Sequence, residues 1–140
     1  MIRSAEAEWN GDLKAGNGTM KLGSGAFQGA YSFRSRMEDG AGTNPEELIG
    51  AAHAGCFSMA LSAVLAGAGH APRRVHTTAQ VHFGPADGGF AISRIHLRAE
   101  AEVPGLDAEA FQRFADDAKQ NCPVSKALAA TPITLDATLL

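Results

Sequence analysis

The 140-residue sequence predicts an α+β fold, and three of its features lead to this prediction. A long run without Asp, Glu, Lys or Arg extends from Leu48 to Pro72, and its apolar part is typical of a buried helix. Residues 75–83 and 95–103 alternate between apolar and polar side chains, the pattern of two half-buried strands. An amphipathic stretch after Asp107 predicts a second helix. The hydrophobic content of 45% is enough for a core, so we expect one domain over residues 1–140.

The first part of the chain is predicted to form short strands. Residues 5–9 alternate in polarity, and residues 10–12 and 16–18 have the Asn and Gly content of turns, so residues 19–22 can pair back in a hairpin meander. Residues 26–37 are predicted as a further strand, which ends in an Arg-Ser-Arg segment at positions 34–36. Two arginines are therefore expected close to the start of the long helix.

The long helix is predicted to begin near Pro45. Thr43 or Asn44 can cap it, Pro45 suits its first turn, and Glu46 and Glu47 lie at the positive end of its dipole. The run is apolar all round, so the helix belongs either in a membrane or inside a protein. We expect no membrane partner, because Ala, Gly, Ser and His fill most positions and no aromatic belt or second span accompanies them. Small residues instead suit close packing on another helix, in a dimer or a compact core.

The later elements follow from alternation and helix caps. Residues 85–89 have the composition of a hairpin loop, so the two alternating strands are predicted to pair antiparallel. The helix that starts after Asp107 is expected to end at Asn121, and Pro123 at a first helical position predicts a short helix over residues 123–129. Residues 133–137 alternate again and are predicted as the last strand.

The charge, the N-terminus and the absence of common catalytic motifs limit the range of functions that we expect. Twelve Lys and Arg against fifteen Asp and Glu give a net charge of −3 without a basic block, so we expect no nucleic-acid partner. The N-terminus has no apolar signal region and reaches Glu6 and Glu8 at once, so we expect a cytoplasmic protein. The sequence has no Gly-rich phosphate loop after a strand, no HExxH and no GxSxG motif. The chemistry is therefore expected at the two cysteines.

Those cysteines are Cys56, within the long helix, and Cys122, at the start of the short one. Two cysteines in a reducing compartment do not form a structural disulfide framework, and one interpretation is that both are small buried apolar residues. Cys122 lies where the helix dipole favours a thiolate. His53, one turn before Cys56, offers an alternative zinc site with both cysteines, although a hydrogen bond from a buried histidine to a neighbour is the simpler interpretation.

A catalytic thiol needs a nearby cation to lower its pKa from about 8.5. Arg34 and Arg36 are the candidates in this sequence, and Glu46 or Glu47 can hold a guanidinium in a bidentate pair. Taken singly, each arginine also fits an ordinary surface role, and each glutamate fits the role of a helix-dipole acid.

Two segments resemble the OsmC/Ohr family of thiol-dependent peroxidases, and specifically its OsmC branch. They are TNPEELIGAAHAGCFSMAL at residues 43–61 and NCPVSKAL at residues 121–128. Shorter matches extend the resemblance across nearly the whole chain, at residues 9–12, 90–92, 103–107 and 133–136. The resemblance implies an intertwined α+β homodimer, with antiparallel sheets packed around long central helices.

The resemblance also implies roles for individual residues. Cys56 would be the peroxidatic cysteine and Cys122 the resolving one, while Arg36 and Glu46 would orient and activate the thiolate. Arg34 is a neighbour that could share the role of Arg36. The implied reaction, part of an oxidative or osmotic stress response, reduces an organic hydroperoxide through a sulfenic acid and a disulfide. An external dithiol, such as a lipoylated protein, would reopen that disulfide without any bound cofactor.

Residue types add an expectation about the substrate. Met37, Phe57 and Leu61 are expected to form an apolar surround that favours bulky organic peroxides over hydrogen peroxide. A second class of function remains open, namely a dimeric redox sensor or small-ligand binding protein in which the same cysteines are oxidised without turnover.

Helix geometry leads to the expectation of composite sites. Glu46 and Cys56 are ten residues apart, which is about 15 Å along a continuous helix. An arginine held by Glu46 is therefore not expected to reach Cys56 of the same chain. We expect an obligate homodimer, in which each site takes Cys56 and Cys122 from one subunit and Arg36 and Glu46 from the other.

Overall fold

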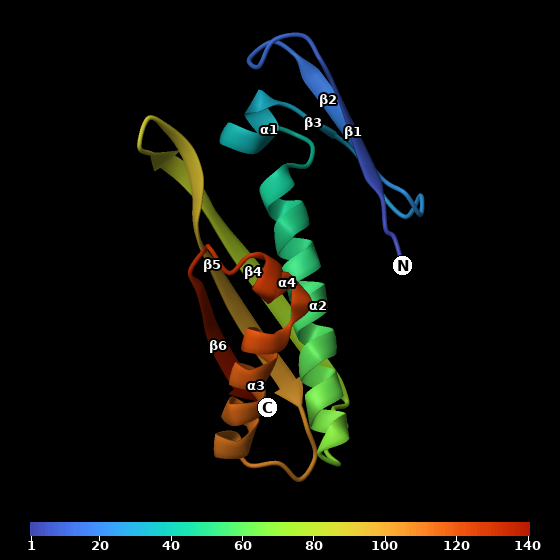
Figure 1. Ribbon diagram of the computed structural model, residues 1–140, viewed down its shortest axis with the longest axis vertical. Coiled ribbons are helices and arrows are strands. Elements are labelled where there is room, and N and C mark those ends of the chain that lie inside the picture. Colours follow the sequence, from blue (N-terminus) through green and yellow to red (C-terminus); the bar gives the residue numbers. More distant parts are fainter. The chain divides into compact units, whose positions relative to one another are not determined.

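The computed structural model describes all residues, 1–140, and they form two compact units, Met1–Leu48 and Ile49–Leu140. The boundary falls inside the long helix α2 (Pro45–Gly67), which continues through it. Strands and helices are both well represented (Figure 1), so the α+β prediction is confirmed.

The first unit contains a three-stranded antiparallel sheet in the order β1-β2-β3, as expected for a meander. Its strands are β1 (Ala5–Asn10), β2 (Asn17–Leu22) and β3 (Gln28–Tyr31). The rings of Trp9 and Tyr31 meet across β2, with centroids 5.2 Å apart. Gly18 lies between them, where a Cβ atom would come within 2.6 Å of the Tyr31 ring. Only glycine leaves room for this aromatic pair.

The segment after β3 differs from the prediction. The strand expected over residues 26–37 ends at Tyr31, and the chain then forms the short helix α1 (Phe33–Met37). The cause is a capping box at Ser32, whose hydroxyl accepts from the Ser35 N–H while the Ser35 hydroxyl accepts from the Ser32 N–H. The Ser35 hydroxyl also donates to the Thr43 carbonyl at 2.7 Å. These bonds hold α1 close to the start of α2.

Helix α2 begins at Pro45, as predicted. The side chain of Asn44 accepts a hydrogen bond from the Glu47 N–H at 2.8 Å and so caps the helix. By length and apolar composition, α2 is the one helix that could cross a membrane. Core helices of soluble proteins meet the same criterion, and Phe57 and Leu61 of α2 are fully buried in the second unit. The finding is therefore weak evidence for a span.

The second unit contains a sheet in the order β4-β5-β6. Strands β4 (Arg74–Ala86) and β5 (Gly89–Glu102) form the predicted antiparallel hairpin, with a bulge between His82 and Phe83. Strand β6 (Ile133–Leu139) pairs parallel to β5, however, and departs from the expected antiparallel sheets. The reason is that α3 (Ala108–Asn121) and α4 (Pro123–Ala127) carry the chain back along the sheet before β6 begins (Figure 1).

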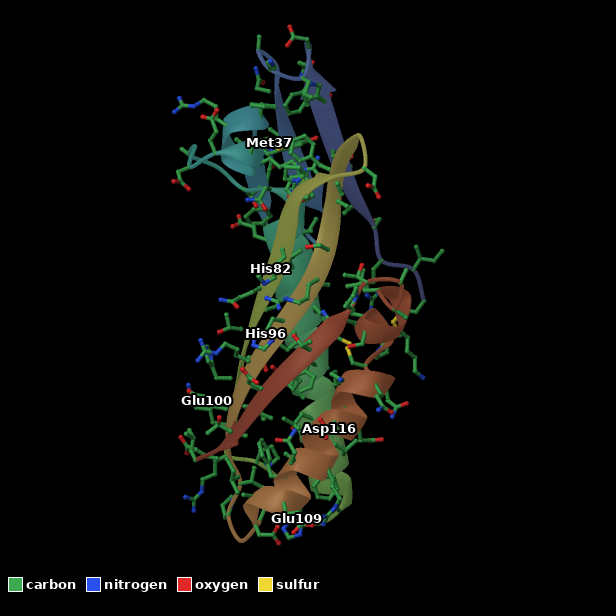
Figure 2. The ribbon with its side chains drawn as sticks, turned by 90° about the vertical axis from the view of Figure 1, so that its left-hand side faces the viewer. Met37, His82, His96, Glu100, Glu109 and Asp116 are labelled. Carbon is green, nitrogen blue, oxygen red and sulfur yellow. The ribbon has the colours of Figure 1, made fainter.

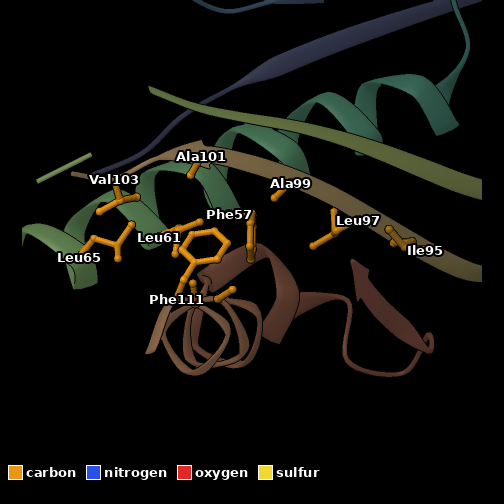
Figure 3. Packing of buried hydrophobic residues seen from close by; sticks show 11 residues of the cluster. Phe57, Leu61, Leu65, Ile95, Leu97, Ala99, Ala101, Val103 and Phe111 are labelled. Carbon is orange, nitrogen blue, oxygen red and sulfur yellow. The ribbon is translucent and has the colours of Figure 1, made fainter. Parts of the chain in front are cut away.

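The core of the second unit lies between this sheet and the helices. Figure 3 shows Phe57, Leu61 and Leu65 of α2 meeting Phe111 of α3 and alternate residues of β5. The intervening residues of the strands, among them His82, His96 and Glu100, lie along the polar face of the sheet (Figure 2). Helix α3 is capped by Asp107, whose carboxylate accepts from the Ala110 N–H at 2.8 Å, as predicted.

Candidate active site

The two cysteines, 66 positions apart in the chain, come together in the second unit. Their Sγ atoms are 2.7 Å apart, and both are free thiols. Cys122 is fully buried, whereas Cys56 on α2 is half-buried. Cys122 occupies the junction of two helices, because its N–H bonds the Ala118 carbonyl at the end of α3 and its own carbonyl accepts from Lys126 in α4. This double role fixes its position against α2.

The surroundings of the two thiols shift their pKa values in opposite directions. Burial raises the pKa of Cys56, the hydrogen bond with Cys122 raises it further, and a bond from the Val124 N–H opposes these effects. Burial also disfavours the charged form of Cys122. Hydrogen bonds from Cys56, from the backbone and hydroxyl of Ser125, and from Val124 nevertheless lower the pKa of Cys122 below its usual value. Within this unit, the negative charge of the pair is therefore favoured on Cys122.

His53 lies in the same part of the molecule and contacts a residue that sequence reasoning missed. Its Nε2 atom is 2.7 Å from the hydroxyl of Ser125, and both side chains are buried. The other ring nitrogen, Nδ1, is buried without a hydrogen-bond partner. Burial lowers the pKa of His53, so its ring is neutral at pH 7.

The zinc site considered for His53 and the two cysteines finds no support in this geometry. No group of three or more His, Cys, Asp or Glu side chains is arranged to hold a metal ion. The observed contact of His53 is with Ser125, which agrees with the simpler interpretation of a buried histidine that bonds a neighbour.

Arg36 and Glu46 form a bidentate ion pair in the first unit. The Nε atom of Arg36 lies 3.1 and 3.2 Å from the two carboxylate oxygens, and a terminal nitrogen lies 2.7 Å from one of them. The Glu46 side chain is only 9% exposed, which strengthens the pair. Glu47 instead accepts a hydrogen bond from the Thr43 hydroxyl at 2.6 Å. Glu46 is therefore the acid that holds the arginine.

Arg34 has a different environment from Arg36. It pairs with Glu38 at 3.4 Å, and both side chains are largely exposed. Such a surface pair contributes little to stability, and it gives Arg34 no buried partner. The structure thus separates the two arginines that the sequence left as alternatives.

An apolar cavity of about 400 Å³ lies beside Arg36 in the first unit. Its lining is Trp9, Gly11, Leu13, Tyr31, Ser32, Phe33, Arg36 and Met37. Met37 lines this cavity, whereas Phe57 and Leu61, the other two residues of the expected apolar surround, are fully buried in the core of the second unit. Sequence reasoning missed the aromatic lining, because strand alternation alone does not show which side chains surround a cavity.

The sequence comparisons identify the family. The sequence model described as "OsmC-like protein" matches residues 38–137. The chain belongs to the OsmC-like family. It is 51% identical over 135 residues to "Peroxiredoxin OsmC" of Escherichia coli (strain K12), covering 96% of this chain and 94% of that one. It is 42% identical over 89 residues to an "Organic hydroperoxide resistance protein" of Xanthomonas axonopodis pv. citri (strain 306), covering 63% and 61%.

Solved structures of the OsmC-like family share the fold. The organic hydroperoxide resistance protein OhrB of Bacillus subtilis matches with a TM-score of 0.70 at 25% identity, covering 98% of each chain. An OsmC-like protein from Mycoplasma pneumoniae matches with a TM-score of 0.77 at 18% identity, covering 100% of this chain and 98% of that one. The second likeness concerns the fold alone.

Proposed function

We propose that this OsmC-family protein is a cysteine-dependent peroxidase that reduces organic hydroperoxides to alcohols. The observation that carries the proposal is the pair of free thiols 2.7 Å apart, one half-buried and one buried. Their spacing lets the second thiol condense with an oxidised first one without a large movement of the backbone. The 51% identity to a peroxiredoxin supports the same class of activity.

The proposed cycle has three steps, and Cys56 begins it because it is the less buried thiol. The Cys56 thiolate attacks the distal oxygen of the hydroperoxide, the O–O bond breaks, and the departing alkoxide takes up a proton to become the alcohol. Cys122 then displaces hydroxide from the Cys56 sulfenic acid, which gives a disulfide and water. An external dithiol, such as a lipoylated protein, reduces the disulfide by thiol exchange. The cycle requires no bound cofactor.

The apolar cavity beside Arg36 supports an organic substrate. Burial of apolar surface contributes about 25 cal/mol per Å², so about 100 Å² of alkyl surface contributes roughly 2.5 kcal/mol to binding. Hydrogen peroxide has no alkyl surface and gains none of this. We therefore propose that bulky hydroperoxides bind with the alkyl group against the aromatic lining and the peroxide group toward Arg36.

Arg36 has a definite task in this proposal. Within the second unit the negative charge favours Cys122, yet the first step needs the charge on Cys56. A guanidinium beside Cys56 stabilises the thiolate there and moves the shared proton to Cys122. Glu46 holds the guanidinium in orientation.

The proposed sites are composite and require a homodimer. Glu46 and Cys56 lie ten residues apart on the unbroken helix α2, about 15 Å along its axis. One side of α2 is exposed and composed of small or apolar residues: Ala52, Gly55, Met59, Ala63 and Ala66. A second copy of α2 would cover this side in water. We propose that each chain acts as a single OsmC-like domain over residues 1–140 and supplies Cys56 and Cys122 to one site and Arg36 and Glu46 to the other.

The proposed setting is a peroxide stress response in the cytoplasm. The balance of acidic and basic residues, with a net charge of −3, suits neither nucleic acid nor an anionic membrane surface. The proposed partners are therefore the hydroperoxide, the dithiol and a second copy of the chain.

Turnover with a dithiol present tests the proposed activity. We expect many equivalents of cumene hydroperoxide to be consumed per subunit, at a higher kcat/KM than for hydrogen peroxide. Cys56→Ser should abolish consumption, whereas Cys122→Ser should consume about one equivalent and stop as a sulfenic or more oxidised acid. The control is wild-type protein without dithiol, which should also stop at one equivalent. Wild-type protein that stops there even with dithiol is a redox sensor, and a fully active Cys56→Ser variant contradicts the assignment.

A further inference from the structure

We propose that Ser125 and His53 form a proton relay that activates Cys122 for disulfide formation, an inference that rests on the proposed peroxidase cycle. In this relay Ser125 is a catalytic residue, because its hydroxyl touches the reacting sulfur. His53 acts through Ser125, as a positioning residue that also accepts the proton. The relay serves the second step of the cycle and not the attack on the peroxide.

The relay consists of a continuous line of contacts between α2 and α4. Cys56 Sγ is 2.7 Å from Cys122 Sγ, the hydroxyl of Ser125 hydrogen bonds with Cys122, and the same hydroxyl is 2.7 Å from His53 Nε2. His53 and Cys122 are fully buried and Ser125 is 5% exposed. Water therefore has little access to the Cys122 proton, and the protein must supply its own acceptor.

The unpartnered Nδ1 atom of His53 distinguishes the relay from a structural contact. Histidines buried for structural reasons normally have partners on both ring nitrogens. Here one nitrogen faces Ser125 and the other is buried with no partner. A neutral ring that carries its proton on Nδ1 leaves Nε2 as a bare acceptor toward the Ser125 hydroxyl. Because burial lowers the pKa of His53, the ring is neutral and ready to accept before the reaction.

The groups around His53 leave Cys122 as its one route for proton exchange. Its own helix contributes Cys56, and α4 contributes Ser125. The residues of β4 and β5 on the core side are apolar except for Thr77, whose hydroxyl accepts a hydrogen bond from Ser58 of α2 at 2.8 Å and does not titrate. The charged residues and histidines of the two strands alternate onto the other face, where Figure 2 shows His82, His96 and Glu100. The others are Arg74, His76, Arg94, Arg98 and Glu102. The core side of α3 is apolar too. The charged residues nearest to Cys122 in sequence are the half-buried Lys119 and the exposed Lys126, both cations that favour a neutral ring.

In the proposed step, the disulfide forms as the sulfenic acid of Cys56 loses its oxygen. The sulfur of Cys122 forms a bond to the sulfur of Cys56, and the S–O bond of the sulfenic acid breaks with its electron pair on the departing hydroxide. Cys122 is thereby oxidised and the sulfur of Cys56 reduced. The thiol proton of Cys122 passes to the Ser125 oxygen while the Ser125 proton passes to Nε2 of His53. The hydroxide takes a proton from solvent and becomes water. His53 keeps the proton of Cys122 until the disulfide is reduced, and the dithiol then releases one proton to solvent, which balances the one that the hydroxide took up.

The same groups also direct the reduction of the disulfide. Cys56 is the more exposed of the two sulfurs, and the thiol of lower pKa is the better leaving group. We therefore infer that the dithiol attacks Cys56 and that Cys122 leaves as a thiolate. A proton returned from His53 through Ser125 restores the Cys122 thiol.

His53→Gln provides the main test, because glutamine can still bond Ser125 but does not titrate. Wild-type and variant proteins are mixed with one equivalent of cumene hydroperoxide between about pH 6 and pH 9. Disulfide formation is then followed by quenching with a thiol-alkylating reagent and mass spectrometry. We expect all proteins to consume the first equivalent. We expect His53→Gln and Ser125→Ala to form the disulfide at least about tenfold more slowly near pH 7, with rates that approach wild type as Cys122 ionises unaided at high pH.

His96→Gln is the matched control, because His96 also bonds a hydroxyl, that of Thr134 at 2.6 Å, but on the polar face of the sheet. It should form the disulfide at the wild-type rate. If His53→Gln matches wild type in rate and pH profile, the relay is wrong although the peroxidase function stands. If wild-type protein consumes no peroxide, the proposed function itself fails.

A measurement on wild-type protein keeps the inference testable if the His53 variants do not fold. Nitrogen-15 NMR of the histidine rings reports the tautomer of the reduced protein directly. We expect His53 to be neutral with its proton on Nδ1. A proton on Nε2 would leave this ring unable to accept from Ser125 and would overturn the relay.

Discussion

Cys56 and Cys122 carry the same side chain 2.7 Å apart, yet their environments shift their pKa values in opposite directions. Only the Val124 hydrogen bond stabilises a thiolate at Cys56, whereas Cys122 receives several hydrogen bonds from the first turn of α4. A peroxidase needs each thiol to be charged at a different moment. The cation that reverses the preference for the first step is, in our proposal, Arg36.

The pH dependence of peroxide attack should show whether Arg36 lowers the pKa of Cys56. A thiol of raised pKa is mostly protonated at neutral pH, so the rate rises with pH until the thiol is ionised. Arg36→Ala should raise the pKa of Cys56 further and move that increase in rate to higher pH. If the pKa rises by about one, the rate near pH 7 falls about tenfold, and the rate should recover in alkali. Stopped-flow measurement of the first equivalent at several pH values checks this.

Arg34→Ala is the control for this measurement, because Arg34 pairs only with exposed Glu38 in the contacts of the first unit. Its pH profile should match that of wild type. A profile for Arg36→Ala that is lowered equally at all pH values would show that Arg36 binds the substrate and does not tune the thiol.

At the scale of elements, the sequence predicts the two long helices well, because their signals are local. Asn44 and Pro45 at the start of α2 and Asp107 at the start of α3 act within one turn of their own positions. Helix α1 could not be predicted in this way, since Tyr31 and Phe33 alternate as in a strand and the capping serines are not a Ser-x-x-Glu box. The parallel pairing of β6 depends on the return path through α3 and α4, which no local signal in β6 records.

The candidate site shows the same division between local and long-range information. Both cysteines stand out by their chemistry, whereas residue types left Arg34 and Arg36, and Glu46 and Glu47, as alternatives. Only the family resemblance selected Arg36 and Glu46 among them. Ser125 could not be selected from the sequence, because its importance comes from its contact with His53, 72 residues away. Contacts of this kind depend on how two helices pack, which residue type alone does not determine.

The capping box of α1 should contribute to both stability and activity. Ser32→Ala removes the side-chain cap and should lower the free energy of unfolding by about 1 kcal/mol. Because α1 carries Arg36, peroxide consumption should fall as well. Chemical denaturation and steady-state turnover measure the two effects. Ser93→Ala, at an exposed strand position whose hydroxyl makes only a 3.5 Å contact, should leave both unchanged. Unchanged stability in Ser32→Ala would mean that packing alone holds α1.

For the whole molecule, the main consequence of the proposal is that one chain is not a complete enzyme. The exposed apolar side of α2 and the separation of ten positions between Glu46 and Cys56 both favour a dimer with a second copy of the chain. In that arrangement the thiols of one chain depend on the guanidinium of the other. Dilution below the dimer dissociation constant should then remove activity as well as assembly.

Subunit exchange tests this dependence. We expect Cys56→Ser homodimers to be inactive and Arg36→Ala homodimers to be about tenfold slower near pH 7, whereas a heterodimer of the two would hold one site with all four residues intact. We expect mixing to restore about one working site per heterodimer. The matched control is Cys56→Ser mixed with Cys122→Ser, which should recover no turnover, because both cysteines of a site come from one chain. Heterodimers that form, as shown by native mass spectrometry, and stay inactive in the first mixture would place all four residues within one chain.

The distance along the chain between the two thiols affects the stability of the oxidised protein and the reduction potential of its disulfide. In the proposed cycle, a disulfide between positions 66 residues apart would remove about 4 kcal/mol of conformational entropy, expressed as free energy, from the unfolded chain. The oxidised form is therefore harder to melt than the reduced form. By thermodynamic linkage, the native fold stabilises the disulfide by the same free energy. This lowers the reduction potential of the disulfide by roughly 90 mV for a two-electron couple. Oxidation in this cycle would thus raise the melting temperature of the protein. The dithiol must have a reduction potential low enough to reduce this stabilised disulfide before the protein can react with another peroxide.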